Sequence, residues 1–290
     1  MIALLVSGMM VFGADAPAMT AGGVEGVVSG FKFTEGPLWT GAGGLIFSDI
    51  PADTIYRADK SVFRQPSGES NGLTLDAEGR LLACEHKNRR VSRTEKDGTV
   101  TVVAERFDGK RLNSPNDLAV RSDGTVFFTD PPYGLPGGLE GPDAELDCAG
   151  VYAVKPGGEA RQLARDFKKP NGIAFSPDEK TLYIADTEGG HVRRFSVAPD
   201  GALAGGGVLY ELPGPDGLKV DRAGNLWCTA GDGVHVVNPE GKRLQLVEIP
   251  ERPSNCAFGG GDGKTLFVTA VTGVYKVGAT TAGILPGPAK

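Results

Sequence analysis

Short runs of alternating apolar and polar residues recur along this chain, and each run is followed by a turn rich in Gly, Asp or Asn. Examples are LIFSD at residues 45–49, VFFTD at 126–130 and TLYIAD at 181–186. This alternation is typical of half-buried antiparallel strands. Gly (44 residues) and Pro (20 residues), the two poorest helix formers, make up more than a fifth of the 290 residues. The pattern predicts an all-β fold of many short strands.

The runs belong to a unit that occurs six times. Each unit begins with a small polar residue, called the anchor here, and continues with a strand, a Gly-containing turn and a second strand. A third and often a fourth strand follow. The six anchors are Glu35, Asn71, Asn116, Asn171, Asp216 and Asn255.

The anchors are 36, 45, 55, 45 and 39 residues apart, close to the ~40–45 residues of one four-stranded propeller blade. We therefore predict a single six-bladed β-propeller domain over residues 19–290. The longest gap, between Asn116 and Asn171, indicates an insertion, for which residues 131–150 are the candidate.

The chemistry of the anchors suggests a metal site. The first strand of a propeller blade lines the central channel, so the six anchors are expected to meet near one channel mouth. All six side chains carry an oxygen acceptor and two are acids, which suits a hard divalent cation. Ca²⁺ fits best, and Mg²⁺, Mn²⁺ or Zn²⁺ are alternatives. Asn-Gly and Asp-Gly pairs are also ordinary turn formers, but six anchors in phase favour the metal site.

The N-terminal residues bear on where the protein is located. Residues 1–18 combine an apolar run with small residues at Ala14, Ala16 and Ala18, as in a signal peptide. No Lys or Arg precedes this run, so a simple N-terminal tail is the alternative. Export predicts a periplasmic or secreted protein; without export it is cytoplasmic.

A net charge of −6 and no long Lys/Arg run disfavour a nucleic-acid partner. No apolar run reaches the ~20 residues of a membrane span, so no membrane partner is expected. The four cysteines lack CxxC spacing, which disfavours a zinc site. The oligomeric state and any disulfide pairing are left open.

Several motifs together carry a family resemblance. They are TEGPLW, SPNDL, TDPPYG, KPNGIAFSPDEKTLYIADT and GPDGLKVD. Over about residues 25–277 the chain resembles the senescence marker protein, gluconolactonase and luciferin-regenerating-enzyme family, and bacterial gluconolactonase-like members most. This resemblance implies a six-bladed propeller with one divalent metal, held by Glu35, Asn171 and Asp216. Asn116 corresponds to a ligand in some relatives and a substrate contact in others.

The resemblance also implies a hydrolase that opens a sugar-acid lactone, a small-molecule substrate. The metal polarises the carbonyl group, and Asp216 is the general base. His86 at a strand end, Tyr133 in the insertion, and the anchors Asn71, Asn116 and Asn255 are the candidate substrate contacts.

Two other functions also fit the sequence. One is a phosphotriesterase of the diisopropylfluorophosphatase type, and the other is a non-catalytic propeller that binds a partner. No GxSxG motif is present, which argues against a serine hydrolase.

Overall fold

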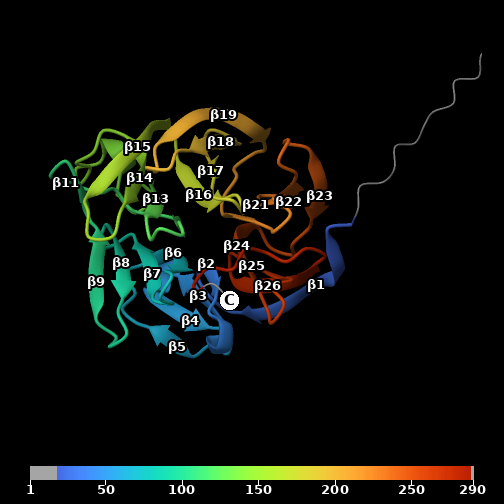
Figure 1. The fold of residues 1–290 in the computed structure, drawn as a ribbon. Coiled ribbons are helices and arrows are strands. Elements are labelled where there is room, and N and C mark those ends of the chain that lie inside the picture. Colours follow the sequence, from blue (N-terminus) through green and yellow to red (C-terminus); the bar gives the residue numbers. More distant parts are fainter. Residues whose placement is uncertain (1–17, 289–290) are drawn as a thin grey trace, which may run out of the picture.

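The computed structural model of this protein describes residues 18–288. Six four-stranded antiparallel sheets follow one another around a ring in chain order, with their first strands toward the middle (Figure 1). The prediction of an all-β, six-bladed propeller is confirmed. The predicted signal peptide lies outside the described residues except for Ala18, and it stays a prediction.

In each of the first five blades the strands follow chain order from the channel outward. Blade one is β2 (Thr34–Trp39), β3 (Leu45–Asp49), β4 (Thr54–Arg57) and β5 (Val62–Arg64). Blade two is β6 (Ser70–Leu75), β7 (Leu81–Glu85), β8 (Arg90–Thr94) and β9 (Val100–Ala104). Blade three is β12 (Leu118–Val120), β13 (Val126–Asp130), β14 (Ala149–Val154) and β15 (Ala160–Phe167). Blade four is β16 (Pro170–Phe175), β17 (Thr181–Asp186), β18 (His191–Val197) and β19 (Leu203–Glu211). Blade five is β20 (Leu218–Val220), β21 (Leu226–Ala230), β22 (Gly233–Val237) and β23 (Arg243–Val247).

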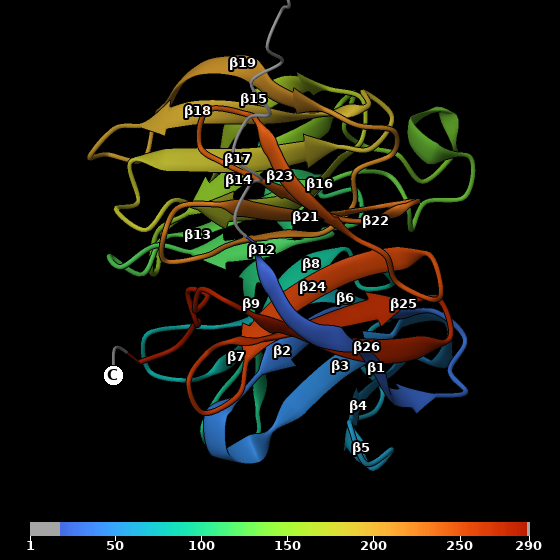
Figure 2. The same ribbon diagram turned by 90° about the vertical axis from the view of Figure 1, so that its right-hand side faces the viewer.

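The sixth blade joins the two ends of the chain. It consists of β24 (Pro253–Gly259), β25 (Thr265–Ala270) and β26 (Gly273–Ala279), and its outermost strand is β1 (Thr20–Ser29). Figure 2 shows β1 lying along β26. The repeat pattern did not reveal β1, because this strand has no anchor of its own and most of its residues are exposed. It closes the ring by hydrogen bonding to the last blade.

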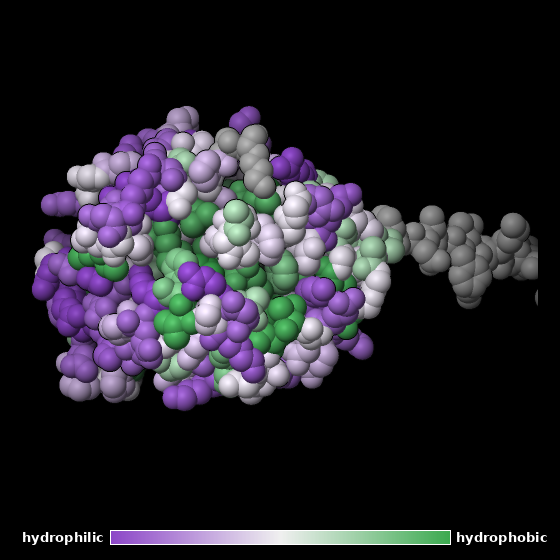
Figure 3. Space-filling view, turned by 90° about the horizontal axis from the view of Figure 1, so that it is seen from below, coloured by the Kyte–Doolittle hydropathy of each residue, from purple (hydrophilic) through white to green (hydrophobic). Residues whose placement is uncertain are grey.

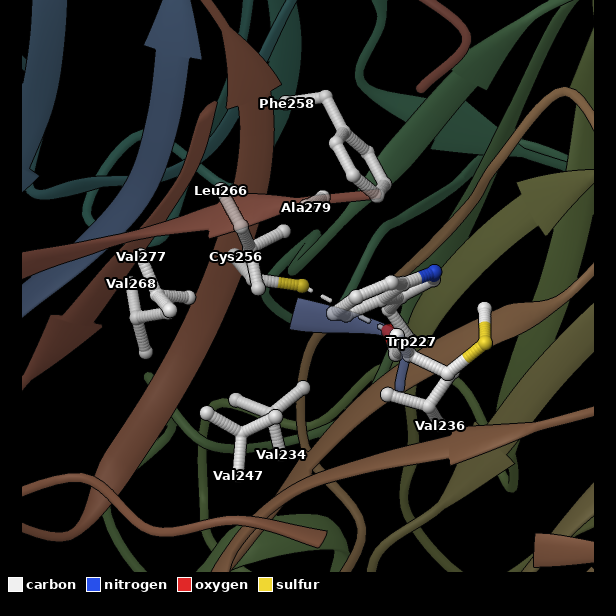
Figure 4. Packing of buried hydrophobic residues seen from close by; sticks show 11 residues of the cluster. Trp227, Val234, Val236, Val247, Cys256, Phe258, Leu266, Val268, Val277 and Ala279 are labelled. Carbon is white, nitrogen blue, oxygen red and sulfur yellow. Dashed lines mark hydrogen bonds between the residues drawn. The ribbon is translucent and has the colours of Figure 1, made fainter. Parts of the chain in front are cut away.

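Apolar side chains fill the spaces between neighbouring blades. Six clusters of buried residues occupy the six interfaces around the ring. Figure 4 shows the cluster between blades five and six, where the Trp227 and Phe258 rings meet edge to face at 5.4 Å. The Cys256 thiol in this cluster donates to the Trp227 carbonyl at 3.5 Å. Each sheet is therefore covered by apolar contacts on both faces, as a closed propeller requires.

The remaining elements are short. Three 3₁₀ turns, η1 (Gly41–Gly43), η2 (Ile50–Ala52) and η3 (Gly138–Glu140), and a small hairpin of β10 (Arg106–Phe107) and β11 (Lys110–Arg111) lie in loops. The predicted insertion is present between β13 and β14 and contains η3. Among the described residues, no helix is long and apolar enough to span a bilayer.

One face of the molecule combines a hydrophilic rim with an apolar centre (Figure 3). On the face seen from below Figure 1, hydrophilic residues cover most of the area and apolar residues gather near the centre (Figure 3). All four cysteines lie within the described residues and are free thiols, and Cys84, Cys228 and Cys256 are buried.

Candidate functional site

The six anchors are buried at the inner strands, as the repeat predicts. Backbone hydrogen bonds connect neighbouring inner strands beside them: the Gly72 amide donates to the Asn116 carbonyl at 2.8 Å, and the Gly172 amide to the Asp216 carbonyl at 3.1 Å. A Cβ on Gly72 would lie 2.6 Å from that carbonyl of Asn116. Glycine after the anchor therefore allows the inner strands to approach closely, which brings the anchor side chains together.

Glu35 lies in β2 with a fixed orientation. Its Oε2 accepts a hydrogen bond from the Gly36 amide at 2.9 Å and another from Asn255 Nδ2 at 3.1 Å. Burial raises the pKa of Glu35 well above its ordinary value, and the Asp216 carboxylate raises it further. Glu35 from blade one and Asp216 from blade five therefore lie within electrostatic reach of each other.

Asp216 precedes β20 and is also buried. Burial raises its pKa to about 7, although the Arg252 guanidinium and a hydrogen bond from Asn171 act in the opposite direction. Two buried carboxylates in one place are destabilised as a pair of anions, and a cation between them would relieve the repulsion.

Two anchor amides have an oxygen without a partner. Asn171 Nδ2 donates to Thr187 Oγ1 at 3.0 Å, and Asn71 Nδ2 lies 3.4 Å from His86 Nε2. The Oδ1 atoms of both asparagines are buried and have no hydrogen-bond partner among residues 18–288. An unsatisfied buried acceptor costs about 1–3 kcal/mol, so these oxygens are ready to bind a cation, a water or a substrate hydroxyl.

The donors present fit a hard divalent cation. Glu35, Asp216 and the free amide oxygen of Asn171 are oxygen ligands, and Asn116 lies on the neighbouring inner strand. Within the described part of the chain, no three His, Cys, Asp or Glu residues gather in a way that could hold a metal. A metal here therefore depends on amide oxygens as well as carboxylates, a combination that suits Ca²⁺ better than a softer ion.

Tyr133 and His86 lie beside the acidic centre, the name used here for Glu35, Asp216 and the anchor amides around them. Partial burial raises the pKa of the Tyr133 phenol, and the Asp216 and Glu35 carboxylates raise it further, which places the ring near both acids. Burial lowers the pKa of His86 to about 4, so its imidazole is neutral at pH 7. Both side chains can therefore offer hydrogen bonds to a neutral ligand.

The structure adds residues that the sequence analysis missed. Thr187 holds Asn171 and itself donates to the Pro215 carbonyl at 2.7 Å. Arg252 lowers the pKa of Asp216, and the buried Asp117 raises the pKa of both Glu35 and Asp216. Only Asp117 left a signal in the sequence: it occupies the place after the anchor where four of the six units have glycine.

Residues 33–272 match the family model of the SMP-30/Gluconolactonase/LRE-like region. The chain is 32% identical to a gluconolactonase of Zymomonas mobilis over 293 residues, which cover 90% of this chain and 82% of that protein. This chain belongs to the SMP-30/gluconolactonase/LRE-like family. The resemblance stated from the motifs is confirmed.

Two solved structures of similar proteins have the same fold. A gluconolactonase from Xanthomonas campestris superposes with a TM-score of 0.80 at 35% identity, covering 88% of this chain and 89% of that one. A calcium-binding protein, regucalcin, from Agrobacterium tumefaciens has a TM-score of 0.76 at 22% identity, covering 93% of this chain and 98% of that one. At this identity the second likeness shows the shared fold alone.

Proposed function

We propose that this protein is a metal-dependent lactonase that opens a sugar-acid lactone, with Asp216 as the general base. The class of enzyme, a carboxylic ester hydrolase acting on lactones, follows from the family and from the gluconolactonases to which the chain is similar. The oxygen donors of Glu35, Asp216 and Asn171 support a divalent cation as the cofactor, and we propose Ca²⁺.

One observation carries the proposal. Glu35 and Asp216 come from blades one and five, are both buried, and are close enough to raise the pKa of Glu35, while Asn171 places a partnerless oxygen beside them. A propeller that only binds a partner through its loops has no need for two buried acids in its channel, because their burial lowers stability.

Glu35, Asp216, Asn171 and Asn116 are the residues that would hold the cation. When bound, it supplies positive charge that polarises the lactone carbonyl and stabilises the oxyanion formed as water adds. Asn255 supports this arrangement, because its Nδ2 fixes the Glu35 carboxylate at 3.1 Å.

Asp216 moves the proton. Its carboxylate accepts a proton from the attacking water while the oxygen of that water bonds to the carbonyl carbon. The ester bond to the ring oxygen then breaks, and the ring oxygen takes the proton to become a hydroxyl. The product is the open hydroxy acid, and no covalent enzyme intermediate is needed.

The neutral groups around the acids orient the substrate. His86 and the free amide oxygen of Asn71 offer hydrogen bonds to sugar hydroxyls. Tyr133, which is 41% exposed, can cover one face of the ring at the channel mouth. Sugar lactones carry several hydroxyls. Neutral hydrogen-bonding side chains beside the acidic centre, namely His86, Asn71 and Tyr133, therefore suit them.

The test compares Asp216→Asn and Glu35→Gln with Glu25→Gln, an equivalent change at a carboxylate on β1 that is 68% exposed. Hydrolysis of glucono-1,5-lactone is followed with Ca²⁺ varied, and Ca²⁺ binding is read from the rise in melting temperature. We expect Asp216→Asn to lower kcat/KM by about 100-fold or more, Glu35→Gln to abolish the calcium-dependent thermal shift, and Glu25→Gln to change neither.

Two other outcomes would assign a different function to the protein. Turnover of an aryl phosphotriester without turnover of any aldonolactone would identify a phosphotriesterase. The absence of a calcium-dependent shift in the wild-type protein, together with no hydrolysis of either substrate, would leave the non-catalytic binding module.

A further inference from the structure

An ion pair crosses the channel next to the anchors. Asp117 follows Asn116 in blade three, and its side chain is 2% exposed. Lys219 lies in β20 of blade five, and its Nζ is 3.4 Å from Asp117 Oδ2. Because blade four lies between these two blades in the ring, the Lys219 side chain reaches across the channel to meet the carboxylate.

The ammonium group has a second partner that fixes its position. Lys219 Nζ donates to the carbonyl of Leu218 at 2.9 Å. Asp117 Oδ1 in turn accepts a hydrogen bond from the Leu118 amide at 2.9 Å. Both charged groups are therefore held by the backbones of their own strands, and the pair is a built part of the channel.

Asp117 belongs electrostatically to the acidic centre. Its charge raises the pKa of Glu35 and of Asp216, so three carboxylates lie within electrostatic reach of one another. Burying three acids with no nearby cation is strongly unfavourable. Lys219 offsets the charge of one of them.

On its other side the pair borders an apolar cavity. This cavity has a volume of about 400 Å³, and Lys219 lines it together with Leu38, Leu73, Leu118 and Val220 of four inner strands. The C-terminal residues 284–287 also line it, and the Ile284 amide donates to the Val220 carbonyl at 3.2 Å. Lys219 thus contacts this cavity as well as Asp117.

We propose that Lys219 is a positioning residue that acts as an internal counter-ion to Asp117, so that Asp117 adds no uncompensated negative charge where Glu35 and Asp216 face one divalent cation. This inference rests on the proposed metal dependence. With Asp117 paired, Glu35 and Asp216 are the carboxylates that attract the ion, and Arg252 lies within electrostatic reach of Asp216. Without Lys219, a third negative charge faces the same ion.

The two partners make opposite predictions for cation affinity. Lys219→Met removes the positive charge with little change in shape, and we expect Ca²⁺ to bind at least about tenfold more tightly, because an unpaired carboxylate now attracts it. Asp117→Asn leaves the ammonium unpaired, and we expect Ca²⁺ to bind at least about tenfold more weakly. Calorimetric titration of the chelator-treated protein measures both affinities and the number of ions bound.

The double variant and two controls separate this role from simple packing. Lys219→Met combined with Asp117→Asn should return the Ca²⁺ affinity to within about threefold of wild type, since the effects of an interacting pair do not add. Lys219→Arg keeps the charge and should bind Ca²⁺ like the wild type. Lys276→Met breaks an exposed ion pair with Glu25 far from the channel and should change nothing.

Equal Ca²⁺ affinities in wild type, Lys219→Met and Asp117→Asn would overturn the proposal, as would shifts of the same sign in both single variants. If Lys219→Met does not fold, the loss expected for Asp117→Asn decides alone. If the wild type binds no Ca²⁺, the proposed metal dependence fails instead. Urea unfolding of the wild type, the two single variants and the double variant then still shows whether Asp117 and Lys219 stabilise each other.

Discussion

Asp130, at the end of β13, is a fully buried acid outside the acidic centre. Its Oδ2 accepts a hydrogen bond from the Asn113 amide at 2.8 Å, while its Oδ1 has no partner among residues 18–288. Burial raises its pKa to about 7, and the hydrogen bonds from Asn113 and Ser114 and the charge of Arg89 only partly oppose this. The folded protein therefore disfavours the ionised carboxylate.

This burial predicts a pH dependence of stability. In the unfolded chain Asp130 ionises near pH 3.8, the ordinary pKa of an aspartate, and in the folded protein only near pH 7. The contribution of Asp130 to the free energy of unfolding is therefore fully present below pH 3.8, falls as the pH rises, and levels off above about pH 7. We expect Asp130→Asn, whose amide oxygen can still accept from Asn113, to remove this loss of about 4 kcal/mol.

Urea unfolding of both proteins between about pH 4 and pH 8 measures the effect, because this range spans the two pKa values. The variant should gain stability over the wild type steadily across that range. Parallel pH profiles for the two proteins would contradict the raised pKa.

At the level of single residues, the anchors were predictable because their position in the repeat is visible in the sequence. Glu35, Asn171 and Asp216 share one place in the unit, and a propeller brings equivalent places together. Thr187 and Arg252 were not predictable, since each acts on an anchor through a contact that only the folded loops create.

The insertion between β13 and β14 is the element that shapes the channel mouth. Asn113 connects the two ends of the insertion, because its side-chain Nδ2 donates to the carbonyls of Asp130 and Cys148, both at 3.0 Å. Ser114, which precedes β12, also binds the insertion: its Oγ donates to the Pro131 carbonyl at 2.6 Å and accepts from the Gly134 amide at 2.8 Å. These contacts hold Tyr133 near the acids.

A methyl group at Gly134 should displace this element. A Cβ there would lie 2.9 Å from the Cβ atoms of both His86 and Ser114, which belong to neighbouring chain segments and cannot move away easily. We expect Gly134→Ala to raise KM for the lactone several-fold, because Tyr133 and His86 shift, while the calcium-dependent thermal shift is kept. Gly207→Ala is the control, since nothing lies within 4 Å of its added Cβ.

Steady-state kinetics of the two variants decide this prediction. An unchanged KM in Gly134→Ala would mean that the insertion does not position the substrate contacts.

At the level of elements, the sequence identified the inner strands and the insertion better than the outer strands. Inner strands are buried, so their alternation and anchors are pronounced, and the 55-residue gap marks the insertion. β1 was missed because its pattern, with Gly22, Gly23 and Gly26 and mostly exposed positions, lacks the alternation of a buried strand. Only its hydrogen bonds to β26 in the folded ring make this segment a strand.

Closure of the ring depends on the contact between β1 and β26. Gly278 of β26 pairs with Ala21, and a Cβ on Gly278 would lie 2.6 Å from the Ala21 carbonyl oxygen. We expect Gly278→Val to lower the free energy of unfolding by about 2 kcal/mol, because the added atoms push β1 away from the sheet. Gly26→Ala changes β1 itself at a position where no atom lies within 4 Å of the added Cβ. This variant should leave the free energy of unfolding nearly unchanged.

Urea unfolding compares these two variants with the wild type. Equal destabilisation by both variants would show that β1 tolerates displacement. Closure of the ring would then depend on other contacts, for instance the apolar interfaces between the blades.

The pairing of β1 with β26 has a consequence for how the molecule forms. β1 comes before every other described strand, and its partner β26 is the last of them (Thr20 lies opposite Ala279), so a growing chain holds an unpaired β1 until β26 has been made. Contacts between such distant segments are slow to form, and open strand edges invite association with other chains. Folding of this protein should therefore be most vulnerable to aggregation just before the last blade is complete.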